Sequence, residues 1–249
     1  MHVLITGHQG FIGPVMIGVF KKAGHTVTGL DIGYFKECTV SGSSLALPDY
    51  EIVRDIRAVR EDDFKGIDAV VHLSALSNDP MGALKPELTY DINLTASVRA
   101  AELAKAAGVS RFIFASSCSI YGAAGTSGAL DESATFNPVS AYAISKVKTE
   151  AALRAMAGDN FSPVYLRNAT AYGVSAPTRL DLVLNNLMAC AYVTGKIRVL
   201  SDGTPWRPLV HIEDISRAAL AAVEGDRAAV HNQPFNIGRG DCSQTQYTL

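Results

Sequence analysis

Short apolar runs alternate with stretches of helical periodicity along this chain. A run at residues 2–6 leads into glycines, then into a helical stretch over residues 11–23 that Gly24 ends, and then into a second run at residues 26–30. Strand, turn, helix and strand within about thirty residues is the size of one βαβ unit. We therefore expect the chain to begin with such a unit.

The same alternation continues to about residue 167. The pattern predicts helices at residues 86–107 and 141–157, and it predicts strands at residues 51–53, 69–73, 111–116 and 163–167. Short apolar strands separated by helices are typical of a parallel sheet covered on both faces. The sequence therefore predicts an α/β fold with a doubly wound parallel sheet over residues 1–167.

Beyond residue 168 the elements become shorter. The pattern predicts helices at residues 180–194 and 212–224 and strands at residues 197–200 and 234–237. We interpret residues 168–249 as a smaller lobe packed on the first domain. Residues 33–48, rich in Gly, Ser and Thr, are expected to form a loop.

Composition and charge exclude several classes of protein. The chain of 249 residues is 48% hydrophobic and 18% charged, which is typical of a globular protein and not of a disordered one. A net charge of −2 gives no reason to expect nucleic-acid or membrane-surface binding. The apolar runs fall far short of the ~20 residues that span a bilayer, and we expect no secretory signal.

The cysteines are far apart and include no C-x-x-C pair. They are expected to be reduced thiols of a cytoplasmic protein, and we predict neither a disulfide framework nor a metal site. The four positions are Cys38, Cys118, Cys190 and Cys242.

The first predicted turn carries the clearest candidate chemistry. Gly7, Gly10 and Gly13 lie between strand and helix, where glycines permit a tight turn, close backbone approach to a pyrophosphate and close helix packing. Free N–H groups and the helix dipole at that point favour phosphate. A glycine triplet alone also fits an ordinary turn, so its position after a strand and before a helix is what favours a dinucleotide site.

Asp31 ends the second predicted strand, 18 residues after Gly13. A carboxylate at that point can accept hydrogen bonds from both ribose hydroxyls and would repel a 2′-phosphate. No Arg or Lys directly follows it. We therefore predict NAD rather than NADP as cofactor, the alternative being that Asp31 is a solvated carboxylate in a turn.

A second group of polar residues follows the strand predicted at residues 111–116. Ser117 comes directly after it, and Tyr142 and Lys146 lie four residues apart on a predicted helix, hence on one face. An ammonium near a phenol lowers the phenol pKa from ~10 toward neutrality, and such a tyrosine can act as a general base. Any long helix can also carry a Tyr and a Lys at this spacing by chance.

Together these features resemble the extended short-chain dehydrogenase/reductase family, the NAD-dependent nucleotide-sugar epimerases and dehydratases. The resemblance covers nearly the whole chain and implies a Rossmann-type sheet with a small substrate-binding lobe. It rests on residues 6–13, Asp31, 55–56, 72–75, Asn93, 116–117, 121–122, Pro138, 142–146, Arg167, 172–173, Arg207 and 211–214.

The resemblance also implies roles for individual residues. Ser117 would bind the substrate hydroxyl, Tyr142 would be the base, and Lys146 would hold the nicotinamide ribose and tune Tyr142. The implied substrate-binding residues are Ser117, Ser119, Thr170 and Arg207, the last as a clamp on the nucleotide diphosphate. The implied cofactor-binding residues are Gly7, Gly10, Phe11, Ile12, Gly13, Asp31, Asp55, Ile56, Leu73, Ser74, Ala75, Asn93, Tyr142 and Lys146.

Several positions depart from the family pattern. The 4,6-dehydratases have an Asp-Glu pair where this chain has Cys118 and Ser119, so dehydration is disfavoured. Adjacent side chains of a strand point to opposite faces, so we expect Cys118 to be a buried small residue. Thr170 replaces an asparagine, and family members usually continue well beyond Gly238. The substrate lobe is therefore expected to be incomplete, whether the chain is a short member or truncated.

We predict an NAD-dependent nucleotide-sugar epimerase that forms a 4-keto sugar and returns the hydride. One alternative is a sugar dehydrogenase or keto-sugar reductase using the same residues, and another is a non-catalytic dinucleotide-binding module. The resemblance further implies a homodimer in which the helices at 86–107 and 141–157 pair with their symmetry mates.

Overall fold

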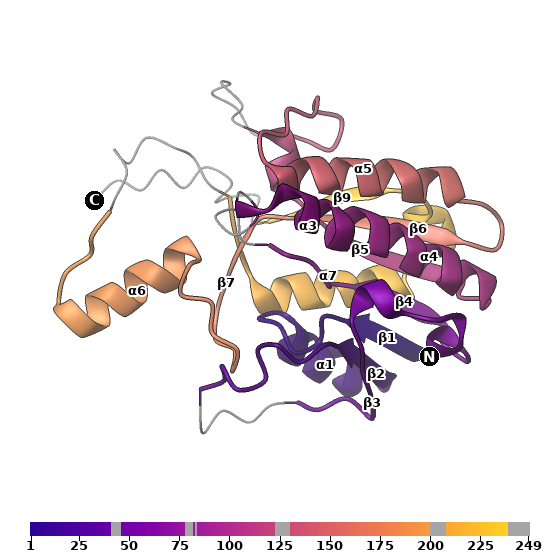
Figure 1. Cartoon of the computed structure of the whole chain (residues 1–249), viewed down its shortest axis with the longest axis horizontal. Coiled ribbons are helices and arrows are strands. Elements are labelled where there is room, and N and C mark those ends of the chain that lie inside the picture. The colour runs from indigo at the N-terminus through magenta and orange to yellow at the C-terminus, as the bar shows by residue number, and fades with distance from the viewer. Residues whose placement is uncertain (41–45, 78–81, 83, 123–129, 200–207, 239–249) are drawn as a thin grey trace.

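The computed structural model describes residues 1–40, 46–77, 82, 84–122, 130–199 and 208–238. Its main feature is a seven-stranded sheet in which every neighbouring pair of strands is parallel, in the order β3-β2-β1-β4-β5-β6-β9 (Figure 1). The α/β, Rossmann-type expectation is confirmed. The strands are β1 (His2–Thr6), β2 (Thr26–Asp31), β3 (Tyr50–Val53), β4 (Ala69–His72), β5 (Arg111–Ser117), β6 (Ser162–Asn168) and β9 (Pro234–Ile237).

Helices cover both faces of the sheet (Figure 1). α1 and α7 pack against each other on one face, and α3, α4 and α5 lie on the other. The helices are α1 (Gly13–Lys22), α3 (Pro86–Tyr90), η3 (Asp91–Ala96), α4 (Ser97–Ala106), α5 (Ala141–Met156), α6 (Val183–Thr194), α7 (Ile212–Glu224) and α8 (Arg227–Val230). Short 3-10 turns are η1 (Ile56–Ala58), η2 (Glu61–Phe64) and η4 (Cys118–Tyr121).

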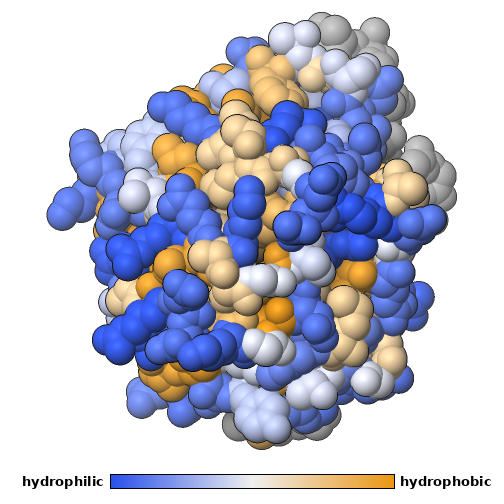
Figure 2. All heavy atoms as spheres, turned by 90° about the vertical axis from the view of Figure 1, so that its right-hand side faces the viewer, coloured by the Kyte–Doolittle hydropathy of each residue, from blue (hydrophilic) through white to orange (hydrophobic). Residues whose placement is uncertain are grey.

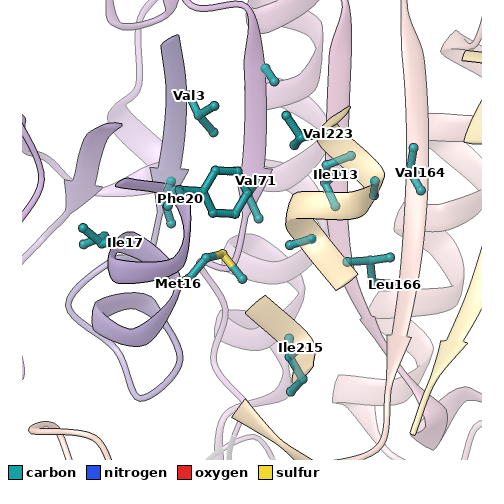
Figure 3. Close-up of a cluster of buried hydrophobic side chains, with 14 of the residues drawn as sticks. Val3, Met16, Ile17, Phe20, Val71, Ile113, Val164, Leu166, Ile215 and Val223 are labelled. Carbon is teal, nitrogen blue, oxygen red and sulfur yellow. The ribbon is translucent and has the colours of Figure 1, made fainter. Parts of the chain in front are cut away.

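Each face of the sheet packs against an apolar core, and this is why the strands are nearly continuous hydrophobic runs in the sequence. On the α1/α7 face, Met16 and Phe20 of α1 and Ile215 of α7 pack with strand residues such as Val3 and Ile113 (Figure 3). A second cluster fills the opposite face under α4 and α5. All seven residues of β6 are buried, as a strand covered on both faces requires. The face shown in Figure 2 is largely hydrophilic, with smaller hydrophobic areas between hydrophilic side chains.

The strand order reverses between β1 and β4. From β1 the chain proceeds to β2 and β3 on one side, while β4, β5, β6 and β9 follow on the other. Such a switch point opens a crevice at the carboxyl ends of the strands, where ligands bind in open α/β sheets. A ligand site is therefore expected at the carboxyl ends of β1 and β4.

The expected helix over residues 86–107 is interrupted in its middle. The chain is α-helical in α3 and α4 but forms one wider π-helical stretch, η3, between them. Asn93 lies in this stretch, and single π turns in helices are often found at functional sites.

The segment after residue 168 divides between the sheet and its surroundings. β9 pairs with β6, and α7 packs on α1, so both belong to the main sheet and its cover. A separate pair of parallel strands, β7 (Thr170–Tyr172) and β8 (Leu209–His211), was not expected from the sequence. α6 stands apart and buries none of its residues (Figure 1).

The strand expected at residues 197–200 is wrong. Residues 197–199 have no regular structure, and residue 200 lies outside the described part. Ile197 and Val199 suit a strand, but within the described residues this segment pairs with no other, and a strand needs a partner as well as a suitable pattern. Among the described residues, no helix is long and apolar enough to cross a membrane.

Candidate functional site

The glycine turn between β1 and α1 is as tight as its sequence predicts. Gly7 has φ +72°, a left-handed conformation that favours glycine, and its N–H bonds to the Leu30 carbonyl at 2.8 Å. A Cβ on Gly13 would lie 2.1 Å from the His8 carbonyl oxygen, and one on Gly7 would lie 2.8 Å from the Ser74 nitrogen. The first and third glycines are therefore required by close backbone contacts.

Gly10 differs from the other two glycines. A Cβ there would meet only the Gly7 carbonyl oxygen, at 3.2 Å, so the turn carries a surface without side chains beside the N-terminus of α1. Phe11 is buried and Ile12 precedes the first residue of α1. This is the side of the turn that a pyrophosphate could approach.

Asp31 lies at the carboxyl end of β2, as predicted. Its Oδ2 accepts a hydrogen bond from the N–H of Gln9 at 3.1 Å, and its Oδ1 accepts one from the N–H of Gly33 at 2.9 Å. The carboxylate is thus held against the glycine turn with lone pairs remaining on both oxygens. The bond from Gly33 closes a turn of the kind that an aspartate often forms two residues ahead of itself, and the bond from Gln9 ties the carboxylate to the glycine turn.

The segment after β4 lies directly beside the glycine turn. The N–H of Leu73 bonds to the Thr6 carbonyl oxygen at 3.1 Å, and the N–H of Ser74 bonds to Thr6 Oγ1 at 3.3 Å. Ala75 follows and is partly exposed. Leu73, Ser74 and Ala75 therefore form the second wall of the crevice at the switch point.

Asn93 supports this wall from behind. Its side chain is 1% exposed, and both its amide atoms bond to the main chain of Leu76, at 2.8 and 2.9 Å. Its own carbonyl accepts a hydrogen bond from Thr149 Oγ1 of α5 at 3.0 Å. The side chain expected to bind cofactor is thus engaged by protein, and it ties η3, α5 and the 73–76 segment together.

His72 forms a further buried link at the end of β4. Its Nδ1 lies 2.9 Å from Thr6 Oγ1 and its Nε2 lies 2.8 Å from Ser97 Oγ. Burial, and the nearby Lys146 charge to a smaller extent, lowers the pKa of His72 to about 3. The ring is therefore neutral at pH 7 and serves as a spacer between β1, β4 and α4.

Asp55 and Ile56 stand beyond β3 at the same edge of the sheet. The Asp55 carboxylate caps η1 through the N–H of Arg57 and pairs with the Arg57 guanidinium, with Nη2 2.6 Å from Oδ2. The Arg57 hydrogen bond lowers the pKa of Asp55. Ile56 is buried, so the two residues are fixed in place, although Asp55 already has a cationic partner.

The predicted catalytic serine stands where β5 ends. Ser117 is its last residue, and its Oγ accepts hydrogen bonds from the Ser119 main-chain N–H (3.2 Å) and hydroxyl (3.0 Å). The next residues form η4 instead of continuing the strand. The prediction of a buried Cys118 on the opposite strand face is therefore wrong, because the strand has ended and Cys118 is partly exposed.

Tyr142 and Lys146 lie in the first two turns of α5, which packs against η4. Ser140 caps this helix by accepting a hydrogen bond from the N–H of Ala143. Lys146 Nζ lies 5.5 Å from the centroid of the Tyr142 ring and 4.6 Å from that of Phe114. The structure thus brings the tyrosine and the lysine together beside the end of β5.

The lysine is buried and held. Its Nζ donates a hydrogen bond to the carbonyl oxygen of Ala115 at 2.7 Å, and the residue is 2% exposed. Burial lowers the pKa of Lys146 to about 7, with Glu150 acting weakly in the opposite direction. Because this pKa is close to neutral, the groups around Lys146 decide how far it is protonated at pH 7.

A buried ion pair lies behind these residues, and the sequence analysis assigned it no role. Arg167 of β6 and Glu150 of α5 approach to 2.8 Å, each with a side chain 3% exposed or less. Glu150 also accepts a hydrogen bond from Ser116 Oγ, and the Arg167 guanidinium donates to the Tyr121 hydroxyl at 2.9 Å. The sequence feature that could have revealed this ion pair is a glutamate four residues after Lys146, on the same buried face of α5.

The predicted substrate residues are only partly brought together. Thr170 begins β7, and its N–H bonds to the Pro208 carbonyl oxygen at 2.9 Å. Asn168, two residues earlier, is buried at the end of β6 with an Oδ1 that has no hydrogen-bond partner. Arg207 lies outside the described residues, so its expected contact with a diphosphate has no structural test.

The loop that follows β7 joins the same edge. Arg179 donates a hydrogen bond to Ser77 Oγ at 3.0 Å, and the N–H of Val40 bonds to the Ala176 carbonyl oxygen at 2.9 Å. Segments following β2, β4 and β7 therefore meet at the carboxyl edge of the sheet. Arg179 is a contact at this edge that the sequence pattern did not indicate.

These residues fit a dinucleotide. The glycine turn offers a bare surface at a helix N-terminus, Asp31 retains acceptor capacity, and Gln9 Oε1 beside it is buried with no hydrogen-bond partner. In the described part of the chain, no group of His, Cys, Asp and Glu could hold a metal ion.

Comparison with known proteins points the same way. The sequence model described as the NAD dependent epimerase/dehydratase family matches residues 3–238. The chain is 27% identical to the UDP-glucose 4-epimerase of Neisseria meningitidis serogroup C over 270 residues, which cover 97% of this chain and 78% of that protein. It is 28% identical to the UDP-glucose 4-epimerase of Corynebacterium glutamicum over 258 residues, covering 97% and 76% of the two chains.

Two of the similar solved structures are complexes with a UDP-sugar and NAD. MoeE5 in complex with UDP-glucose and NAD has a TM-score of 0.81 at 29% identity, over 96% of this chain and 77% of that chain. The UDP-glucuronic acid 4-epimerase of Bacillus cereus in complex with UDP-glucuronic acid and NAD has a TM-score of 0.80 at 25% identity, with the same coverage. TunA, an NAD-dependent NDP-hexosamine 5,6-dehydratase, has a TM-score of 0.83 at 25% identity, over 96% and 76% of the chains.

Proposed function

Since the chain belongs to the NAD dependent epimerase/dehydratase family, we propose that it is an NAD-dependent epimerase of UDP-sugars that inverts the sugar at C4. The observation that carries the proposal is that the Tyr142–Lys146 face of α5 packs beside the end of β5, where Ser117 is the last residue and Lys146 bonds to Ala115. The similar epimerases support UDP as the nucleotide.

The carboxyl end of β5 supports epimerisation over dehydration. Eliminating water from a sugar needs an acid and a base close to the reacting carbons. Cys118 and Ser119 of η4 supply no carboxylate there. Ser119 instead donates a hydrogen bond to Ser117 Oγ, which orients the serine hydroxyl at the site.

In the proposed reaction, Tyr142 removes the proton of the sugar 4-hydroxyl and later returns one to the same oxygen. Ser117 holds that hydroxyl, with its own Oγ oriented by Ser119. The glycine turn and Asp31 would hold NAD⁺, which would supply reversible hydride transfer at C4, so that the sugar is inverted with no net redox change.

Lys146 has two proposed tasks. Its ammonium would bind the nicotinamide ribose hydroxyls and would stabilise the Tyr142 phenolate, whose ring centroid lies 5.5 Å from Nζ. The hydrogen bond to the Ala115 carbonyl fixes its position before any ligand enters. Glu150, one helical turn further on, keeps a negative charge close by.

Proton NMR of the protein with NAD⁺ and a panel of UDP-sugars tests the proposal. We expect a new sugar isomer without accumulation of NADH. Equimolar NADH would replace the proposal with a sugar dehydrogenase, which the same three residues could serve. If NAD⁺ bound but no sugar changed, the chain would be a dinucleotide-binding module and the proposal would fail.

We also propose a homodimer formed through the α4 and α5 surfaces. Beside α5 lies an open groove whose lining is part apolar and part charged: Phe136, Val147, Glu150, Ala151, Arg154 and Ala155. Its apolar members Val147, Ala151 and Ala155 lie on α5, one of the helices to which the proposed homodimer assigns a partner helix. A strictly monomeric mass in light scattering would refute this contact.

A further inference from the structure

Gln9, in the middle of the glycine turn, joins two carboxylates. Its main-chain N–H donates to Asp31 Oδ2 at 3.1 Å, and its side-chain Nε2 donates to Glu51 Oε1 at 2.5 Å. Its remaining polar atom, the amide oxygen Oε1, is buried and has no hydrogen-bond partner. A buried acceptor left without a donor is costly unless a ligand or water satisfies it.

Glu51 is placed by the sheet. It lies on β3 in register with Gly29 of β2, so both point to the α1 face. The missing side chain at Gly29 leaves room for the His8 ring, since a Cβ there would lie 2.5 Å from it. His8 Nε2 lies 3.1 Å from Glu51 Oε1, and His8 is 2% exposed.

The ionised state of Glu51 agrees with the hydrogen bonds that it accepts. Burial raises the pKa of Glu51, but the hydrogen bonds from Gln9 and His8 outweigh it, with a weaker attraction from Lys36, and the net pKa is lowered. An ionised Glu51 only accepts, so His8 donates to it through Nε2, while His8 Nδ1 is buried and has no hydrogen-bond partner. Glu51 thereby also fixes which end of the Gln9 amide is the oxygen.

The free Gln9 Oε1 lies at the end of β2. A Cβ on Gly33 would be 3.5 Å from this oxygen, and the Gly33 N–H itself bonds to Asp31 Oδ1 at 2.9 Å. Gln9 Oε1 and the Asp31 carboxylate are thus neighbouring acceptors. Acceptors attract a hydroxyl, which can donate, and repel a phosphate, which cannot.

We propose that Gln9, oriented by Glu51, is a second cofactor-selecting residue. Its Oε1 accepts a hydrogen bond from the 2′-hydroxyl of the adenosine ribose of NAD and works with Asp31 against a 2′-phosphate. This rests on the proposed NAD-dependent function. Glu51 and His8 are positioning residues that act through Gln9.

Calorimetric titration of the purified protein with NAD⁺ and with its 2′-deoxyadenosine analogue tests the proposal. Gln9→Met removes the polar atoms at similar volume. We expect it to weaken NAD⁺ binding about 3- to 10-fold, the range for one neutral hydrogen bond, and to leave binding of the 2′-deoxy analogue nearly unchanged. Glu51→Gln should act in the same direction and should add little to Gln9→Met, because both remove one interaction.

Matched controls separate the possible causes. Glu37→Gln makes the same charge change at an exposed position on the loop after β2 and should leave both titrations unchanged. An equal loss for both ligands in Gln9→Met would mean that Gln9 only shapes the turn, and unchanged NAD⁺ binding would also overturn the proposal. Either outcome leaves the proposed epimerase intact, whereas a wild-type protein that binds no NAD⁺ would remove its basis.

Discussion

Lys146 of α5 donates a hydrogen bond through Nζ to the carbonyl oxygen of Ala115 in β5 over 2.7 Å. The ammonium has left water to make this bond, and it lies over the Phe114 ring. One carbonyl and an aromatic face replace a full hydration shell only in part. This imbalance lowers the pKa of Lys146 to about 7 and makes the residue sensitive to its surroundings.

A first prediction concerns the pH dependence of stability. Between pH 7 and 10.5 the unfolded chain keeps a proton on Lys146 that the folded protein has lost, so its contribution to the free energy of unfolding rises with pH. The slope approaches about 1.4 kcal/mol per pH unit within this window. In Lys146→Met this contribution should be absent. Urea unfolding from pH 6 to pH 9 measures the difference, and parallel curves for the two proteins would contradict it.

Tyr142→Phe should abolish turnover while leaving the fold and the binding of NAD⁺ intact. The substitution removes only the hydroxyl from a side chain in the first turn of α5. Loss of a general base costs typically 10²–10⁴-fold in rate. Tyr192→Phe, on the exposed surface of α6, is the matched control and should keep full activity. A Tyr142→Phe variant with the wild-type rate of sugar inversion would remove Tyr142 from the mechanism.

Asp31→Ala should weaken NAD⁺ binding and reduce the discrimination against NADP⁺. The carboxylate is fixed by the N–H groups of Gln9 and Gly33, and hydrogen bonds to a charged group are worth about 1.5–3 kcal/mol, or roughly 10- to 100-fold in affinity. Asp62→Asn removes an exposed carboxylate elsewhere and should change neither affinity. An unaltered ratio of the two dissociation constants would show that Asp31 does not read the ribose.

Glu150→Gln should destabilise the protein strongly. It leaves the guanidinium of Arg167 buried beside a neutral amide, and breaking a buried pair from one side costs about 3–5 kcal/mol. Glu213→Gln breaks the exposed pair with Arg217 on α7 and should cost less than about 1 kcal/mol. Thermal unfolding of both variants checks the contrast. Equal effects would mean that the Glu150–Arg167 pair contributes no more than a surface pair.

The sequence alone was sufficient for most of the sheet and its helices. Apolar strands such as β1, β4 and β5 and the capped helix α5 are local patterns, and their alternation admits few topologies. The turn formed by Gly7, Gly10 and Gly13 was also predictable from the sequence, because a backbone that needs positive φ or close approach restricts the residue type at that position.

Other features depend on partners far apart in the chain. β7 and β8 are three residues each and exist only because they pair with each other, whereas residues 197–199, with two β-branched apolar side chains, form no strand with any part of the chain that the structure describes. The end of β5 at Ser117 likewise changed the surroundings of Cys118, since alternation holds only while the strand continues.

What the sequence determined by itself was therefore the order of elements, the glycine turn, and the pairing of Tyr142 with Lys146, because these depend on spacing along one or two neighbouring elements. What only the tertiary structure decided was which polar groups are buried, such as Glu150 with Arg167, and which unrelated segments meet, such as Gln9 with Glu51. Desolvation and hydrogen bonding depend on the positions of atoms in space. A sequence gives the chemical character of each group, and the fold decides what that group touches.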